Sequence, residues 1–234
     1  MKTLISQDPL STAQAFADFL AQKVSENDMV HIALSGGSTP KILFELLADE
    51  YDEDIDWEKL HFWWGDERCV PPTDNDSNYK MTKELLFDAI SIKDAQIHRV
   101  LGENEPQDEA KRYGEEILKH LPTVNGFPQF DIIMLGMGGD GHTASIFPHE
   151  MSLLEDKAIC GVAKHPESGQ KRVTLNGPVI NNAKNICFLV TGEGKTEKVN
   201  EIFHQKEDYL SYPAAHFNGQ NVVWYLDDSA ARML

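Results

Sequence analysis

Residues 130–148, FDIIMLGMGGDGHTASIFP, combine a hydrophobic run with a glycine-rich turn, and the rest of the chain can be interpreted around them. This stretch begins as an apolar run over residues 132–135, which is typical of a strand buried in a parallel sheet. The run breaks into closely spaced glycines, with the carboxylate of Asp140 among them and the imidazole of His142 directly after them. Open α/β sheets bind ligands beyond the carboxyl ends of their strands. We therefore expect Asp140 and His142 to lie in a functional site.

Similar apolar runs alternate with helical patterns along the rest of the chain. A strand is expected near the N-terminus, followed by strands at 29–34, 60–64, 158–163, 172–175, 185–191 and 222–226. Helices are expected at 10–25, 40–47, 78–90, 105–120 and 195–203, with a short one closing the chain. This alternation predicts an α/β fold, in which a mostly parallel open sheet of the Rossmann-like kind has helices on both faces. Since no repeat, low-complexity tract or linker interrupts it, one domain spanning residues 1–234 is expected.

Composition excludes several classes of partner. The net charge of −17, from 38 acidic and 21 basic side chains, repels nucleic acid and anionic membrane surfaces. No apolar run approaches the roughly 20 residues that span a bilayer. The N-terminal segment carries Asp8 and Asp18 and does not resemble a signal peptide, so a cytoplasmic protein is expected. The three cysteines, Cys69, Cys160 and Cys187, are far apart, which indicates reduced thiols and no metal site.

The segment Ser35-Gly36-Gly37-Ser38-Thr39-Pro40 joins a predicted strand to a predicted helix. Pro40 suits the first helical position, and Ser38 or Thr39 suits the cap before it. Glycine amides, hydroxyls and a helix N-terminus together suit a phosphate group. The spacing differs from that of a Walker A loop, and an ordinary capped strand–helix turn would explain the same residues.

An anionic substrate would need local positive charge to overcome the acidic surface. Arg68 follows an aromatic-rich strand and could clamp a phosphate, or it could form a structural ion pair with Asp66 or Glu67. Lys195 follows two glycines at another strand–helix junction, where it could bind phosphate or simply be solvated. The weaker candidates are Arg172, at the start of a short strand, and His165, in a loop. The strand ends at 35–39, 65–68, 136–142 and 191–195 would meet in one crevice if their strands are neighbours.

The glycines after residue 135 formally match GxGxxG, but the surrounding sequence argues against a dinucleotide. Pro148 leaves room for barely two helical turns, and no second strand ends in an acid at the required distance. His142 instead suits general-base catalysis on a water molecule, because imidazole titrates near neutral pH. Asp140 could orient His142, bind substrate, or cap a short helix. Neither a nucleophile elbow nor a metal-binding motif is present in the sequence.

Five motifs in order make the chain resemble the 6-phosphogluconolactonase family, within the group that includes glucosamine-6-phosphate deaminases. They are LSGGSTP at 34–40, GDER at 65–68, GMGGDGHTASIFP at 136–148, RVTL at 172–175 and GEGK at 192–195. DGHTASIFP favours the lactonases, because the deaminases resemble DGHIAFNEP at this point. The segment GQKRVTLN departs from the PPERITLT that is usual in the family.

The resemblance implies a deaminase-like or ribose-5-phosphate-isomerase-like fold. It also implies hydrolysis of 6-phospho-D-glucono-1,5-lactone in the oxidative pentose phosphate pathway, with no metal or organic cofactor. His142 would be the general base, supported by Asp140, and Arg172 would lie near the substrate. The phosphate would be held by Gly36, Gly37, Ser38, Thr39, Arg68 and Lys195.

The expected partner is therefore a small sugar-phosphate lactone bound to a monomer or weak homo-oligomer. Two alternatives remain open: a glucosamine-6-phosphate deaminase/isomerase, and a non-catalytic sugar-phosphate sensor.

Overall fold

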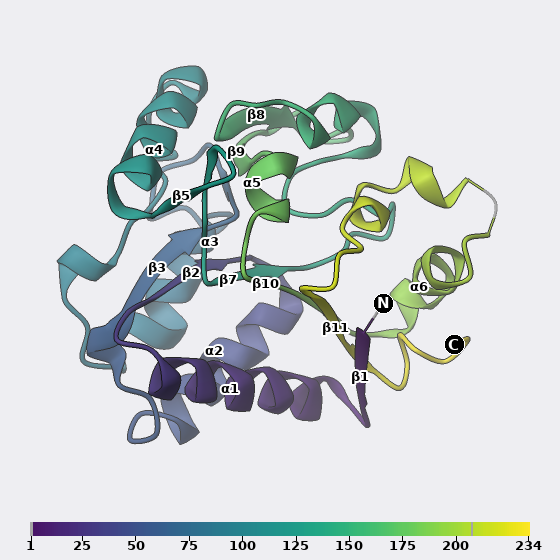
Figure 1. Cartoon of the computed structure of the whole chain (residues 1–234), viewed down its shortest axis with the longest axis horizontal. Coiled ribbons are helices and arrows are strands. Elements are labelled where there is room, and N and C mark those ends of the chain that lie inside the picture. Colours follow the sequence, from purple (N-terminus) through teal and green to yellow (C-terminus); the bar gives the residue numbers. More distant parts are fainter. Residues whose placement is uncertain (1, 207) are drawn as a thin grey trace.

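A six-stranded parallel sheet forms the centre of the computed structural model, which describes residues 2–206 and 208–234 (Figure 1). Every pair of neighbouring strands runs parallel. The strands, in spatial order, are β1 (Lys2–Ser6), β11 (Val222–Asp227), β10 (Asn185–Val190), β7 (Ile132–Leu135), β2 (Val30–Leu34) and β3 (Leu60–Trp64). The predicted parallel α/β sheet is confirmed.

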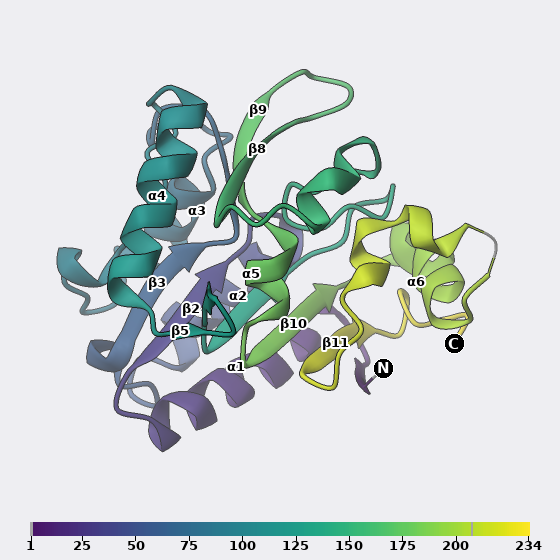
Figure 2. The ribbon, with the colours of Figure 1, turned by 45° about the horizontal axis from the view of Figure 1, so that its top comes forward.

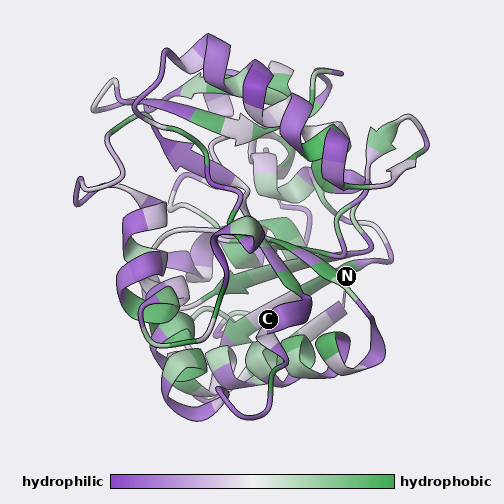
Figure 3. Cartoon of the chain, turned by 90° about the vertical axis from the view of Figure 1, so that its left-hand side faces the viewer, coloured by the Kyte–Doolittle hydropathy of each residue, from purple (hydrophilic) through white to green (hydrophobic). Residues whose placement is uncertain are grey.

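Helices cover both faces of this sheet, and Figure 2 shows α1 on one side with α4 and α5 on the other. They are α1 (Pro9–Glu26), α2 (Ser38–Glu50), α3 (Asn78–Thr82), α4 (Pro106–His120), α5 (Gly177–Asn181) and α6 (Thr196–Phe203). The first begins where the Asp8 side chain accepts a 2.8 Å hydrogen bond from the Ser11 N–H. Figure 3 shows the hydrophobic strands enclosed between helices whose outer surfaces are hydrophilic.

A second, antiparallel sheet stands above the carboxyl edge of the first. It contains β4 (Asp66–Arg68), β9 (Lys171–Leu175) and β8 (Cys160–Lys164), in that order. Strand β4 follows β3 almost directly in sequence. It pairs with β9, and this pairing places Arg68 opposite Arg172. A further hairpin pairs β5 (Thr123–Val124) with β6 (Phe127–Pro128).

One helix prediction is confirmed in part and another is wrong. The helix expected at 78–90 is helical over residues 78–87, as the five-residue α3 followed by the π-helical turn Lys83–Phe87. After β11, residues 228–233 form turns in place of a closing helix. There the Asp227 carboxylate accepts from the N–H groups of Ala230 and Gly192, so the chain folds back onto the end of β10. Within the described ranges, no helix combines the length and apolar character that a membrane span requires.

Buried histidines form a cluster where β2 meets β3. His31 and His61 are register partners on these strands, and their ring centres lie 5.0 Å apart. The Trp63 indole donates to Nδ1 of His31 at 3.1 Å, and a ring nitrogen of His61 lies 2.9 Å from one of His98. Burial, reinforced by the charge of His61, lowers the pKa of His31 to about 4. The folded chain therefore disfavours protonation of His31.

This cluster predicts a loss of folding stability on mild acidification. Between pH 6.5 and about 4 the unfolded chain binds a proton at His31 that the folded chain does not, so the free energy of unfolding falls as the pH falls through this window. The contribution of His31 is at most ~3 kcal/mol. Urea unfolding of the wild type and His31→Asn at pH 7.5 and 4.5 measures it. The variant should lose less stability than the wild type, and an equal loss in both would contradict the assignment.

Candidate active site

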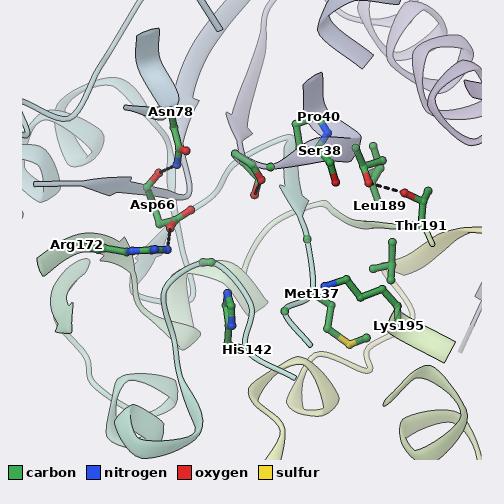
Figure 4. A pocket seen from close by; sticks show the side chains of 18 of the residues that line it. Ser38, Pro40, Asp66, Asn78, Met137, His142, Arg172, Leu189, Thr191 and Lys195 are labelled. Carbon is green, nitrogen blue, oxygen red and sulfur yellow. Dashed lines mark hydrogen bonds and ion pairs between the residues drawn. The ribbon is translucent and has the colours of Figure 1, made fainter. Parts of the chain in front are cut away.

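A cavity of about 210 Å³ opens at the carboxyl ends of β2, β7 and β10 (Figure 4). It lies where the small antiparallel sheet faces the central sheet, so several separate segments of sequence contribute to its walls. They supply residues 35–40, Asp66, Arg68, Asn78, residues 136–138, His142, Ala144, Arg172, residues 189–191 and Lys195. The four strand ends picked out from the sequence therefore converge on one cavity.

Eight of the ten candidate site residues line this cavity. They are Gly36, Gly37, Ser38, Thr39, Arg68, His142, Arg172 and Lys195. Asp140 lies behind His142 and contacts it directly. His165 lies apart: its Nδ1 accepts from the N–H groups of Glu167 and Ser168 in the loop between β8 and β9. It contributes to that loop and to the packing around Phe147, whose ring centre is 5.4 Å away.

The cradle at the start of α2 differs in detail from the expected cap. The helix begins at Ser38, and its cap is Gly37 at φ +120°, a backbone conformation that favours glycine. Ser38 and Thr39 thus lie inside the first turn, where backbone N–H groups have no partner within the helix and the dipole is positive. The Thr39 hydroxyl also lies 2.7 Å from that of Thr191, which ties the cradle to the end of β10.

Glu67 and Asn78 organise one wall of the cavity, and neither role was predicted from the sequence. The Glu67 carboxylate accepts 2.8 Å hydrogen bonds from the N–H groups of Arg68, Asn78 and Tyr79. The Asn78 amide donates to the carbonyl of Asp66 at 2.9 Å. A Cβ on Gly36 would lie 1.9 Å from Asn78 Oδ1, so this glycine permits close packing. The role of Glu67 could have been inferred from the acidic GDER segment at the end of a buried strand, because a buried carboxylate needs several hydrogen-bond donors.

The arginines carry donors that the folded chain leaves unused. The ion pair considered between Arg68 and Asp66 or Glu67 is not found among the described residues: Arg68 Nη1 donates to the Asp76 carbonyl at 2.6 Å. Asp66 faces Arg172 instead, with 3.9 Å between carboxylate and guanidinium. In residues 2–206 and 208–234, Nε of Arg68 and Nε of Arg172 are buried without a hydrogen-bond partner. Buried donors of this kind favour an anionic ligand.

Lys195 supplies positive charge on another wall. It ends a short 3-10 turn, Glu193–Lys195, immediately before α6. Burial lowers the pKa of Lys195, while the charge of Asp140 opposes this effect. Figure 4 shows His142 between Arg172 and Lys195. A bound anion would stabilise the charged ammonium group.

Asp140 and His142 form a short hydrogen-bonded pair. His142 Nδ1 lies 2.5 Å from Asp140 Oδ1, which also accepts from the His142 N–H at 3.1 Å. Partial burial works against the charge of Asp140, but the hydrogen bond and charge of His142 outweigh it and lower the pKa of Asp140 to about 2. An ionised carboxylate can only accept, so the neutral imidazole carries its proton on Nδ1. Nε2 is then the nitrogen with a free lone pair.

The alternative that Asp140 only caps a short helix is wrong, because no helix directly follows it. Residues 143–146 form a tight turn closed by a bridge between Thr143 and Ile146, and the next helical segment is the 3-10 helix Pro148–Leu154. Phe147 is fully buried in this stretch, and its ring centre lies 4.7 Å from that of His142. The carboxylate of Asp140 therefore orients His142 from one side while Phe147 packs against its ring.

A positively charged cavity with a histidine–carboxylate pair, at the carboxyl edge of a parallel sheet, defines an α/β enzyme that acts on a small anion. The sequence profile of glucosamine-6-phosphate isomerases/6-phosphogluconolactonase matches residues 8–224. The chain belongs to this family.

Individual relatives show the same likeness. The chain is 50% identical over 230 residues to the 6-phosphogluconolactonase of Haemophilus influenzae, covering 95% of this chain and 97% of that protein. The crystal structure of devB protein is 47% identical, with a TM-score of 0.95, over 100% of this chain and 99% of that one. The solved 6-phosphogluconolactonase of Trypanosoma brucei is 29% identical, with a TM-score of 0.88, over 100% and 98%.

Proposed function

We propose that this chain, acting as one domain over residues 1–234, hydrolyses 6-phospho-D-glucono-1,5-lactone to 6-phospho-D-gluconate in the oxidative pentose phosphate pathway. The observation that carries the proposal is the Asp140–His142 pair in a cavity that also holds Arg68, Arg172 and Lys195. Curated relatives named 6-phosphogluconolactonase, including one that is 50% identical, support the same activity.

The reaction needs one base and no covalent nucleophile, because a lactone is an activated ester. His142 Nε2 takes a proton from water, and the resulting hydroxide attacks the lactone carbonyl carbon. The tetrahedral intermediate then collapses by breaking the bond to the ring oxygen, which takes the proton back from the imidazolium. Ionised Asp140 stabilises the imidazolium while it exists and keeps Nδ1 as the donor.

The phosphate lies at the cradle, held by the amides of Gly36 and Gly37 and the hydroxyls of Ser38 and Thr39. Lys195 and Arg68 neutralise its charge, and Arg172 contacts the substrate near His142. These groups bind a part of the substrate that does not react, so they orient the carbonyl toward the base. They also concentrate positive charge in a chain whose net charge is −17.

Parallel assays separate the proposed activity from the alternatives. A pH-stat records acid released from freshly prepared 6-phosphogluconolactone, and a second assay records ammonia released from glucosamine 6-phosphate. We expect acid release well above the spontaneous rate and no ammonia. Ammonia release would indicate a deaminase, and thermal stabilisation by the sugar phosphate without either product would indicate a sensor.

Gly138→Ala should disable the base while leaving the fold intact. A Cβ on Gly138 would lie 2.1 Å from His142 Nδ1 and 2.6 Å from Asp140 Oδ1, so the imidazole must move. Misplacement of a reacting group by about 1 Å costs roughly 10²-fold in kcat. Gly139→Ala is the matched control, because its Cβ would meet nothing within 4 Å. Initial rates of lactone hydrolysis measure the difference, and similar rates in the two variants would contradict the placement of His142.

A further inference from the structure

A segment before β11 covers the turn that carries Asp140 and His142. Figure 2 shows this yellow segment beside the teal loop that follows β7. The Tyr212 ring packs on Gly141, where a Cβ would lie 2.6 Å from both Cβ and Cγ of the tyrosine. Gly141 has a φ of +83°, and its carbonyl accepts from the Ala214 N–H at 3.1 Å. The turn is therefore held by both a side chain and the backbone of this segment.

The Tyr212 hydroxyl is fixed in turn by two charged groups on α6. It donates to the Glu201 carboxylate at 2.6 Å and accepts from Lys198 Nζ at 2.8 Å. Lys198 also donates to Glu201 at 2.9 Å and lies 4.5 Å from the centre of the Tyr212 ring. Hydrogen bonds from Tyr212 and Lys198 lower the pKa of Glu201, which keeps it ionised as an acceptor. The contacts with Lys198 and Glu201 on α6 thus hold the Tyr212 ring against Gly141.

Tyr212 does not line the cavity, so any effect on the reaction must pass through the turn. Gly141 lies directly between Asp140 and His142 in sequence, and a shift of its peptide moves both partners of the 2.5 Å hydrogen bond. The start of α6, next to Lys195, has its own support: the Thr196 hydroxyl donates to the Ser229 carbonyl at 2.7 Å. Loss of the Tyr212 ring would therefore affect the base and leave the phosphate site in place.

We infer that Tyr212 is a positioning residue for lactone hydrolysis, which clamps Gly141 so that Asp140 holds the His142 imidazole in its reactive orientation. This inference rests on the proposed function for its kinetic consequence, while its structural consequence can be measured without turnover. The ring makes the clamp, and the hydroxyl network with Lys198 and Glu201 keeps the ring in place.

Three variants test the clamp: Tyr212→Ala, Tyr212→Phe and, as a control on the same segment, exposed Leu210→Ala. We expect Tyr212→Ala to lower kcat by roughly 10- to 100-fold with KM for the phosphorylated lactone within about twofold of the wild type. Tyr212→Phe retains the ring over Gly141 and should retain most of kcat, as should Leu210→Ala. A raised KM with unchanged kcat in Tyr212→Ala would overturn the inference.

A proton NMR spectrum of the ligand-free protein gives a readout that does not depend on turnover. The His142 Nδ1–H, protected by its hydrogen bond to Asp140, should resonate far downfield and be assigned by its absence in Asp140→Ala. This signal should broaden by exchange in Tyr212→Ala and persist in Tyr212→Phe. Its full persistence in Tyr212→Ala overturns the inference.

If Tyr212→Ala does not fold, Tyr212→Leu, which lacks a flat ring over Gly141, must show the same losses. Absence of lactonase activity in the wild type would refute the proposed function alone.

Discussion

We expect His142→Ala to lower kcat for 6-phosphogluconolactone by about 10²–10⁴-fold, the usual loss when a general base is removed. The reason is geometric as well as chemical: Asp140 fixes the proton on Nδ1, so Nε2 is the nitrogen available to water in the cavity that we propose for the phosphorylated substrate. KM changes little, because the cradle and its cations do not depend on the imidazole. Initial rates are measured in a pH-stat above the spontaneous opening of the lactone.

The matched control for this variant is His149→Ala. His149 packs on the same Phe147 ring at 5.7 Å, but it is half-exposed, lies outside the cavity lining and bonds to the Lys164 carbonyl at 3.0 Å. It should keep nearly the full kcat. A His142→Ala variant as active as His149→Ala would rule out His142 as the base.

We expect Lys195→Ala to raise KM for the phosphorylated lactone by roughly 10- to 150-fold, the range expected when one hydrogen bond to a charged group is lost. The half-buried ammonium has no carboxylate within salt-bridge distance among the residues that the structure describes, so its charge is available to the substrate. The effect on kcat should be small, since the proposed partner of Lys195 is the phosphate, which does not react.

Two comparisons make the Lys195 prediction specific to the phosphate. Steady-state rates with unphosphorylated gluconolactone should be nearly unchanged in Lys195→Ala. Lys184→Ala removes an equal charge from the amino end of β10, where Lys184 pairs with Asp131 at 2.7 Å, and should leave KM unaltered. An equal loss on both lactones, or an equal rise in KM in Lys184→Ala, would show that Lys195 acts through the general field of the protein.

The central sheet could be predicted from the sequence because most of its strands are dominated by apolar residues. Ile132 to Leu135 and the strand Val30–Leu34 are buried along their whole length. The first run ends directly at Gly136, and the second, in which only His31 is polar, ends at Ser35-Gly36. The polar residues after those runs were equally visible, since they interrupt the pattern abruptly. The convergence of their strand ends required in addition that the strands be neighbours, and the order β10, β7, β2, β3 meets this condition.

The small antiparallel sheet could not be predicted in the same way. Strand β4 is only three residues long and consists of Asp66, Glu67 and Arg68, which no hydrophobic period distinguishes from a loop. Its pairing with β9 is a contact between distant parts of the chain, and this pairing turns Arg172 from a weak candidate into a cavity residue. Such a pairing between distant segments cannot be predicted from local sequence patterns.

The predicted boundaries of two helices were inaccurate because of local backbone conformations. Gly37 replaces Ser38 or Thr39 as the cap because its φ of +120° lets α2 begin two residues early, and helix ends depend on such single conformations. The helix expected to extend to residue 90 is interrupted at Lys83 by a π-helical turn. The turn after Asp140 differs in this respect, because it makes long-range contacts, among them the packing of Tyr212 on Gly141.

The most direct test of the account compares wild-type hydrolysis of 6-phosphogluconolactone and of unphosphorylated gluconolactone in one pH-stat experiment, each corrected for its spontaneous rate. A cavity in which a phosphate cradle orients the carbonyl toward His142 predicts a kcat/KM for the phosphorylated lactone at least roughly 10²-fold higher than for the other. Equal values for the two lactones, or no rate above the spontaneous one, would contradict it.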